Sequence, residues 1–257
     1  MIAEQNLKFC AQFLRDKRFG MEVNMKIVMI HGQNHKGNTY YIANKIVENI
    51  NIEKDVTEFF LPRDLNHFCT GCFSCVKDES KCPFYDKKRK ILDEVEQADL
   101  LIFTTPTYCM RASAPMKSFL DFTFTYWMIH KPRKCMFNKR AVVVSSAAGS
   151  GAKSAIKDIT TSLFYWGVPC IKTYGISVSA MNVEQIPDKI KVKIQRDTEK
   201  IARSIVKKSK VRVGIKTKVI FTFMRLMQKG NMGASVEEKK YWEDNGWLGK
   251  ERPWRRG

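Results

Sequence analysis

The sequence lacks any long hydrophobic run. None of its 257 residues belongs to an apolar stretch near the ~18 residues that a membrane-spanning helix needs. The first twenty residues have no apolar core or cleavage site typical of a secretory signal, so we expect a cytoplasmic protein. Cysteines in that compartment stay reduced. This disfavours a disulfide framework and favours metal or redox chemistry for the eight cysteines present.

Acidic residues are few. Asp and Glu number 26 against 45 Lys and Arg, a formal net charge of +19, and most of the excess lies after residue 182. A basic surface can attract nucleic acid, anionic lipid, phosphorylated ligands or an acidic partner, although a merely solvated basic face is the commoner case. No nucleic-acid fold signature accompanies the charge, so we expect no specific nucleic-acid partner.

The middle of the chain alternates apolar strand segments with helical patterns. Hydrophobic residues make up 44% of the sequence, which suffices for one well-buried core. Asn38 is the expected N-cap of the first helix, Pro115 falls in the first turn of the third, and Gly167 ends the fourth. Five such units predict a doubly wound three-layer α/β sandwich, in which ligands bind at the carboxyl ends of the strands. The expected strands are 27–30, 56–61, 100–103, 141–144 and 171–176.

The loop 31–39 has the features of an anion site. It contains glycines and polar residues and leads directly into a helix N-terminus, whose free N–H groups and dipole attract negative charge. Gly32 and Gly37 have the spacing of a nucleotide-binding P-loop, but Asn38 and Thr39 follow where that loop has Lys and then Ser or Thr. This disfavours a triphosphate and leaves a single terminal phosphate, with an ordinary capped turn as the alternative.

Two further strand-end loops, 105–113 and 145–152, consist mainly of small and hydroxyl-bearing residues. Such loops let backbone amides approach the edge of a flat heterocycle, against which Tyr108 can pack. The second loop also holds Gly149 and Gly151, with Ser154 near the third position of a dinucleotide fingerprint. We discount that fingerprint because it follows the fourth strand and no acidic residue lies about twenty positions on.

Four cysteines form the most specific local pattern, C-x2-C-x2-C-x6-C. Compact spacing of this kind lets one loop enclose an iron–sulfur cluster, and zinc could use the same thiolates. Reduced cysteines without a ligand, on a surface insertion, remain the alternative. We place a [4Fe–4S] cluster ahead of zinc, with the expected ligands Cys69, Cys72, Cys75 and Cys82.

Together these segments resemble the flavodoxin-like NAD(P)H-dependent FMN reductases, in particular the iron–sulfur flavoproteins. The resemblance covers about residues 25–180 and rests on 36–39, the four cysteines, 98–108, and Lys117 with Asp121. It implies a five-stranded parallel sheet of order 2-1-3-4-5 and FMN as cofactor. The implied phosphate contacts are Gly32, Gln33, Asn34, Lys36, Gly37, Asn38 and Thr39. The implied flavin-ring contacts are Pro106, Thr107, Tyr108, Cys109, Ala147, Gly149 and Gly151.

The activity that this resemblance implies is FMN-dependent oxidoreduction. Hydride would come from NADH or NADPH, and electrons would pass to a small molecule or redox protein: a flavin, a quinone or an iron–sulfur centre. The flavin carries the chemistry, so we expect no catalytic acid, base or nucleophile in the protein. The alternative is an electron carrier or redox sensor without NAD(P)H turnover. Relatives of this kind commonly form homodimers, and the aromatic stretch 119–127 would suit the interface.

The two ends depart from the family pattern. We divide the chain into an N-terminal extension (1–24), a flavin-binding domain (25–209) with a cysteine-rich insertion (66–85), and a basic C-terminal extension (210–257). An apolar helical segment at 219–227 follows a basic stretch, and packing on the core or a second subunit is favoured over contact with an anionic membrane. Ser235 and Glu238 have the spacing of a capping box, which predicts a last helix ending near Gly246.

Overall fold

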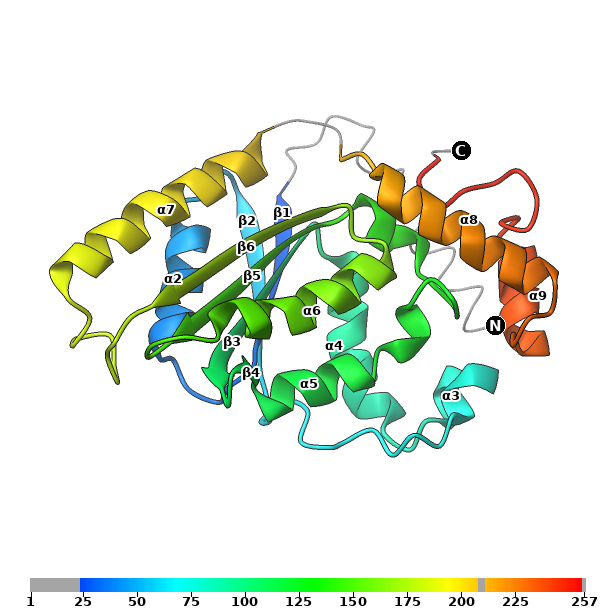
Figure 1. Cartoon of the computed structure of the whole chain (residues 1–257), viewed down its shortest axis with the longest axis horizontal. Coiled ribbons are helices and arrows are strands. Elements are labelled where there is room, and N and C mark those ends of the chain that lie inside the picture. Colours follow the sequence, from blue (N-terminus) through cyan, green and yellow to red (C-terminus); the bar gives the residue numbers. More distant parts are fainter. Residues whose placement is uncertain (1–23, 208–210, 256–257) are drawn as a thin grey trace.

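A parallel sheet forms the centre of the molecule (Figure 1). The computed structural model describes residues 24–207 and 211–255. Its parallel strands are β1 (Met25–His31), β2 (Lys54–Phe60), β3 (Leu100–Tyr108), β5 (Arg140–Ala147) and β6 (Cys170–Ser177), in the order β2-β1-β3-β5-β6. Counted along the chain, this is the expected order 2-1-3-4-5, so the fold class is confirmed. A sixth strand, β4 (Arg111–Ala112), pairs antiparallel with the end of β3. The sequence could not show it, because two residues carry no periodicity.

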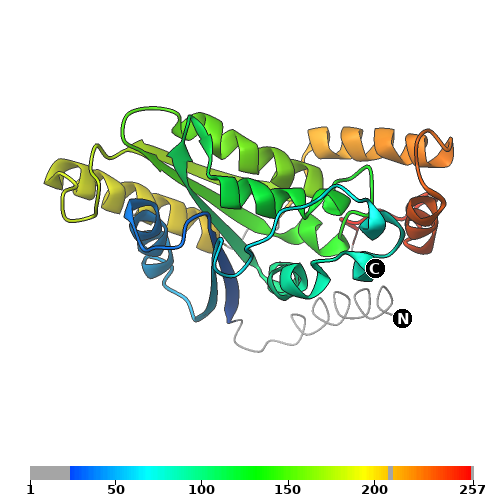
Figure 2. The same cartoon turned by 90° about the horizontal axis from the view of Figure 1, so that it is seen from below.

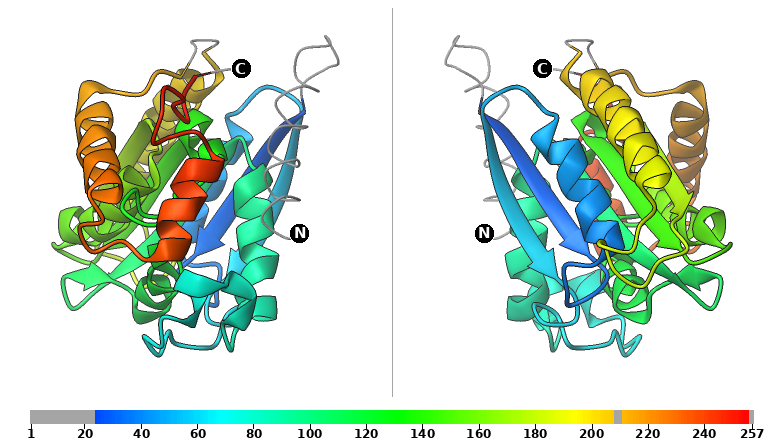
Figure 3. Two further views of the ribbon diagram at one scale, coloured as in Figure 1. Left: turned by 90° about the vertical axis from the view of Figure 1, so that its right-hand side faces the viewer. Right: turned by 90° about the vertical axis from the view of Figure 1, so that its left-hand side faces the viewer.

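Helices cover both faces of the sheet (Figure 3). One face packs on α4 (Tyr85–Gln97), α5 (Ala114–Asp121) and α6 (Ala152–Trp166), and the other on α2 (Asn38–Glu48) and α7 (Asp188–Val206). Alternation along β1 decides which side chain enters which layer: Val28 and Ile30 join the first core, whereas Ile27 and Met29 join the second. Both cores are apolar, as expected for a parallel sheet that is buried on two sides.

The structure confirms the helix termini expected at Pro115 and Gly167 and corrects the one expected at Asn38. Gly167 ends α6 as predicted, with a left-handed φ of +92°. Asn38, however, is not an N-cap: Gly37 holds that position without a side-chain bond, and the Asn38 amide Nδ2 donates instead to the carbonyl of Ala180 at 2.8 Å. The prediction was wrong because a distant carbonyl competes for an amide that sequence reasoning assigns locally.

The cysteine-rich insertion lies between β2 and α4. It contains two short helical turns, α3 (Ser74–Lys77) and η1 (Glu79–Lys81). Between α5 and β5, two further 3-10 turns follow, η2 (Phe124–Tyr126) and η3 (Lys134–Asn138).

The C-terminal segment folds back onto the core. It forms α8 (Ile215–Lys229) and α9 (Val236–Asp244), and α9 begins with the predicted capping box between Ser235 and Glu238. Phe221, Trp242 and Trp247 are fully buried in a third apolar cluster, together with Met128 and Phe137. This shows the expected packing on the core, and it places α9 beside α3 (Figure 3, left).

The expected N-terminal extension covers residues 1–24, and of these only residue 24 is among the described residues. Within the described part of the chain, no helix combines the length and hydrophobicity needed to span a bilayer. Of the proposed dimer stretch, Phe119, Phe122 and Tyr126 are buried in the chain's own core, whereas Phe124 and Trp127 are half-buried. The homodimer therefore stays a prediction, with only the latter two aromatics available for contact.

Gly167→Ala should destabilise the protein by about 2–4 kcal/mol, because a methyl group there would lie 2.5 Å from Cζ of Phe137 and the left-handed φ disfavours any side chain. Urea unfolding measures the loss. Gly149→Ala is the matched control, since a Cβ at Gly149 meets no atom within 4 Å, and it should change stability by less than about 0.5 kcal/mol. Equal effects of the two substitutions would contradict this account of the α6 terminus.

Candidate functional site

The loop from β1 to α2 is tied down at its first residue. The Gly32 amide donates to the carbonyl of Thr104 at 2.7 Å, and the Gly32 carbonyl accepts from the Ser113 hydroxyl at 2.5 Å. A Cβ at Gly32 would lie 2.6 Å from that hydroxyl oxygen, so only glycine permits this approach. The loop is thereby held against the end of β3 and the start of α5.

The α2 N-terminus that this loop presents is suited to an anion. Its N-cap, Gly37, supplies no side-chain acceptor, and its first turn contains no acidic residue. Lys36 adds a positive charge one residue earlier. Asn38 leaves its Oδ1 buried without a hydrogen-bond partner among the described residues. Free N–H groups, the helix dipole and a nearby cation together form the donor set that a phosphate requires.

Hydroxyl groups join the three strand-end loops to one another. Thr39 Oγ1 lies 2.6 Å from Ser146 Oγ, which links the first loop to the end of β5. Thr107 Oγ1 lies 3.0 Å from Ser145 Oγ, which links β5 to the end of β3. Twelve of the fourteen expected cofactor residues lie on loops or strand ends at the carboxyl edge of the sheet, next to β4 in Figure 1, and the other two, Asn38 and Thr39, lie in the first turn of α2 at the same edge. Which of them contact FMN stays a prediction.

A short hairpin projects from this edge. Cys109 and Met110 form its turn with left-handed φ values of 49° and 65°, and β4 leads the chain back. Arg111 holds the hairpin to α6 through an ion pair with Asp158. Tyr108 and Met110 remain half exposed, at 53% and 52%. An exposed aromatic ring beside a polar edge is suited to packing on a flat ligand.

Sequence reasoning missed the part played by His31. It is the last residue of β1 rather than the first of the loop, and it is fully buried. Its Nδ1 lies 2.9 Å from Thr104 Oγ1 and its Nε2 lies 3.3 Å from a carboxylate oxygen of Glu58. Burial lowers the pKa of His31 despite the neighbouring Glu58. His31 thus acts as a neutral polar bridge between β1, β2 and β3 beneath the loop. Its place at the end of an apolar run was the one signal in the sequence.

The four expected metal ligands lie around one small pocket. Cys69, Cys72, Cys75 and Cys82 all line a cavity of about 10 Å³, with the buried Lys88 and four phenylalanines. Burial raises the pKa of the Cys75 thiol, and Lys88 partly offsets this; hydrogen bonds from Ser74 lower the pKa of Cys72. The donor set therefore fits a thiolate-bound group. The arrangement of these thiols in the structure does not match a metal site, because no group of three or more His, Cys, Asp or Glu side chains in the described residues is placed to hold a metal ion.

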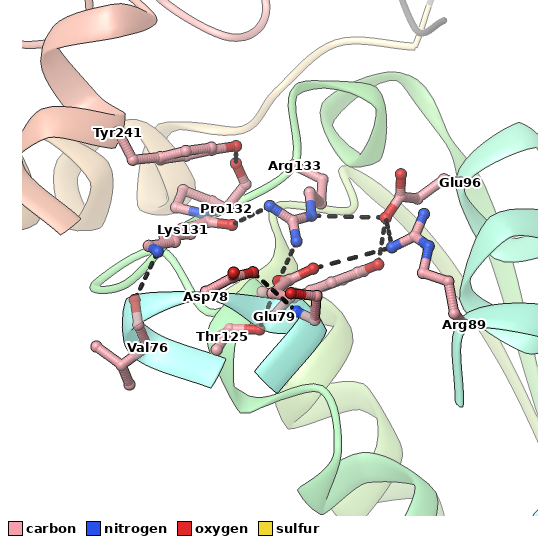
Figure 4. Close-up of polar contacts among 12 residues, drawn as sticks. Val76, Asp78, Glu79, Arg89, Glu96, Thr125, Lys131, Pro132, Arg133 and Tyr241 are labelled. Atoms are coloured by element: carbon pink, nitrogen blue, oxygen red, sulfur yellow. Dashed lines mark hydrogen bonds and ion pairs between the residues drawn. The ribbon is translucent and has the colours of Figure 1, made fainter. Parts of the chain in front are cut away.

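A buried ion network, drawn in Figure 4, anchors this insertion. Glu79 forms an ion pair with Arg133, lies 4.0 Å from Arg89 and accepts from Thr125 at 3.3 Å. Burial opposes ionisation of Glu79, but Arg133, Lys88 and Arg89 outweigh it, so the pKa of this carboxyl lies below its ordinary value of 4.5. Glu79 is therefore charged at neutral pH.

Glu96 forms the other end of the same network. It pairs with Arg89 at 3.1 Å and with Arg133 at 3.5 Å, and it accepts from the Tyr126 hydroxyl. The guanidinium of Arg133 also stacks on the Tyr126 ring, 4.7 Å from its centroid. Sequence patterns could not reveal this network, because its members come from η1, α4, η2 and the segment before η3.

Arg133 belongs to a short segment, 130–133, that also holds α9. Glu238 pairs with His130 Nδ1 at 2.6 Å, the Trp242 indole donates to the His130 carbonyl at 2.7 Å, and the Tyr241 hydroxyl donates to the Pro132 carbonyl at 2.6 Å. On its other side, Lys131 Nζ donates to the Val76 carbonyl of α3 at 2.5 Å. Residues 130–133 therefore connect the cysteine-rich insertion to the C-terminal extension (Figure 4).

The parallel sheet of order β2-β1-β3-β5-β6, covered by helices on both faces, is a flavodoxin-like fold. Residues 25–182 match the NADPH-dependent FMN reductases, and the chain belongs to that family. It is thus an FMN-dependent oxidoreductase, as the sequence predicted.

Two archaeal relatives and one solved structure are similar to parts of the chain. An iron–sulfur flavoprotein of Methanocaldococcus jannaschii is 31% identical over 143 residues, which cover 52% of this chain and 69% of the relative. An iron–sulfur flavoprotein of Archaeoglobus fulgidus is 29% identical over 98 residues, 38% of this chain and about half (48%) of the relative. The FMN-dependent NADH-azoreductase of Bacillus anthracis, solved with FMN, superposes with a TM-score of 0.55 at 11% identity, covering 71% of this chain and 99% of that one. The similarity to the azoreductase structure shows that the two chains share a fold.

Arg133→Met should lower the free energy of unfolding by about 3–5 kcal/mol, because it leaves Glu79, whose side chain is only 18% exposed, without its principal partner. Denaturant titration measures the change. Arg203→Met is the control: Arg203 is 79% exposed and pairs with Glu199 on the surface of α7, so this variant should lose less than about 1 kcal/mol. A small loss from Arg133→Met would show that the network does not anchor the insertion.

Proposed function

We propose that this FMN-dependent oxidoreductase takes hydride from NAD(P)H and passes the electrons to a small-molecule or redox-protein acceptor. The observation that carries the proposal is the convergence of three polar loops at one sheet edge, in a chain that belongs to the NADPH-dependent FMN reductase family. Bound FMN would supply the hydride-accepting and electron-donating chemistry of this reaction.

The chain's own residues would bind and orient the cofactor. The α2 N-terminus, with Lys36 and Thr39, would hold the phosphate, and Asn38 would direct its buried, unsatisfied Oδ1 to a donor on the ligand. The backbone of 106–109 and 147–151 would face the flavin ring, with Tyr108 beside it. The azoreductase solved with FMN has the same fold, which is consistent with this placement.

A pocket next to the hairpin favours a reductase over an electron carrier. It has a volume of about 580 Å³ and lies between α5 and α6. Three cations (Arg111, Lys117 and Lys157), two aromatic residues (Trp127 and Phe124) and six further residues line it, among them Asp121 and Asp158, which pair with Lys117 and Arg111 and leave one excess positive charge. Cationic and aromatic side chains together are suited to a dinucleotide, which carries phosphates and flat rings. A carrier without turnover needs no such space.

NADPH or NADH added anaerobically to the FMN-loaded protein should bleach the flavin absorption band. Lys117→Gln with Lys157→Gln should raise the concentration needed about tenfold or more, because two cations of the pocket are lost, while FMN affinity stays unchanged. Lys189→Gln with Lys200→Gln, exposed on α7, is the charge-matched control. A yellow protein that neither nucleotide reduces would be an electron carrier, and a chain that takes up no FMN would contradict the assignment of the edge loops.

We further propose that Cys69, Cys72, Cys75 and Cys82 ligate a [4Fe–4S] cluster, ahead of zinc. Two observations support this: all four thiols share one pocket, and the archaeal relatives are named iron–sulfur flavoproteins. Lys88 would offset part of the negative charge of the bound thiolates. Because the pocket measures only about 10 Å³, the insertion would have to open around its ligand.

Protein purified anaerobically should contain four irons and four acid-labile sulfides per chain. Cys72→Ser should abolish both, since each ligand of a compact cluster is needed. Cys170→Ser, on β6 and away from the insertion, should leave both unchanged. Finding zinc without sulfide would make the insertion a structural zinc site, and finding neither metal would refute ligation.

A further inference from the structure

Helix α8 is apolar on two opposite faces. Its inner face buries Phe221, whose ring lies 4.8 Å from that of Trp242 and 5.7 Å from that of Trp247, centroid to centroid. On the same face, the buried Gln228 donates to the carbonyl of Ile129 at 2.7 Å. This face accounts for the attachment of α8 to the core.

The outer face carries a stripe of exposed apolar side chains, which we call the α8 stripe. Ile215, Val219, Phe223 and Leu226 are 80%, 60%, 55% and 53% exposed. Their spacing of four, four and three residues places them on one side of the helix, opposite the buried face. A helix that is apolar all round is normally covered on both sides. The described chain covers only one side of α8.

Basic residues flank this stripe. Lys216, Lys218 and Lys229 are exposed on α8, and no Asp or Glu occurs between Glu199 and Glu237. Arg225 is engaged inward, donating to the carbonyls of Trp247 and Leu248 at 3.0 and 2.9 Å, so it fixes the helix to the chain's end. The exposed surface of α8 thus combines apolar contact area with uncompensated positive charge.

We propose that the α8 stripe is a docking surface for an anionic lipid membrane. A lipid surface supplies both things that this face lacks: an apolar layer for the four side chains and negative headgroups for the three lysines. A second copy of the chain would offer apolar cover too, but a symmetric contact through α8 would bring the same lysines together without acidic partners. Figures 1 and 2 show α8 along the outside of the molecule, where it can lie flat on a plane.

Vesicle sedimentation of the FMN-loaded full-length protein tests the proposal. Binding is expected to vesicles that contain phosphatidylserine, to be absent with phosphatidylcholine alone, and to fall as salt rises. Lys216→Gln, Lys218→Gln and Lys229→Gln together should weaken binding about 100-fold, given the contribution of each lysine near an anionic surface. Val219→Ser with Phe223→Ser should remove binding, although the lysines remain.

Matched variants separate this surface from general charge. Lys87→Gln, Lys189→Gln and Lys200→Gln remove the same charge from exposed sites on α4 and α7, and Val192→Ser removes an apolar group that is 70% exposed on α7. These should reduce binding by less than about threefold, and all variants should keep the wild-type circular dichroism. Two results would overturn the proposal. The first is equal binding by the α8 variants and the control variants. The second is a wild-type protein that binds no vesicles but forms a dimer, which Val219→Ser with Phe223→Ser converts to monomers.

Discussion

The partly buried ion pair between Arg133 and Glu79 is the interaction on which the arrangement of the cysteine-rich insertion and the C-terminal extension depends. Removing two charges from water costs several kcal/mol for each ion, and a single contact rarely repays it. Here the cost is spread over a network, because Arg89 and Glu96 pair with the same groups and Tyr126 packs against the guanidinium. Such a network is stable only when all its members are present, so it couples segments that are remote in the sequence.

That coupling gives the C-terminal extension a role beside the cysteine-rich insertion. The segment 130–133 bonds to α9 through three contacts and to α3 through Lys131, and Arg133 secures η1 through Glu79. Tyr241 lies at this junction close to Arg133. Desolvation raises the pKa of its phenol to about 12, and Arg133 partly offsets this effect. These contacts therefore hold the second half of the cysteine-rich insertion in place, whereas Cys72, which precedes α3, remains exposed.

Most of the fold could be predicted from the sequence because it depends on local patterns. Apolar runs such as 27–30 and 141–144 locate buried strands, Gly167 ends α6, and Ser235 with Glu238 starts α9. The position of the three strand-end loops could also be predicted, because the carboxyl ends of parallel strands meet at one edge of the sheet. Predictions failed where a polar group had a distant alternative: the Asn38 amide bonds to Ala180, 142 positions away. The hairpin at Cys109 escaped notice because its second strand, β4, has only two residues and so carries no periodicity. The ion network escaped notice because its members come from separate elements.

The exposure of one face of α8 follows from the contacts that fix the opposite face. Phe221 and Gln228 fix the inner side of the helix, and Arg225 locks it to the carbonyls after α9. With the helix unable to rotate, Val219 and Phe223 cannot turn inward, and no other described element lies over them to exclude water. Replacing these side chains by polar ones would cost the folded chain little, because they make few internal contacts. Their apolar character therefore contributes little to folding, which agrees with the docking role proposed for the α8 stripe.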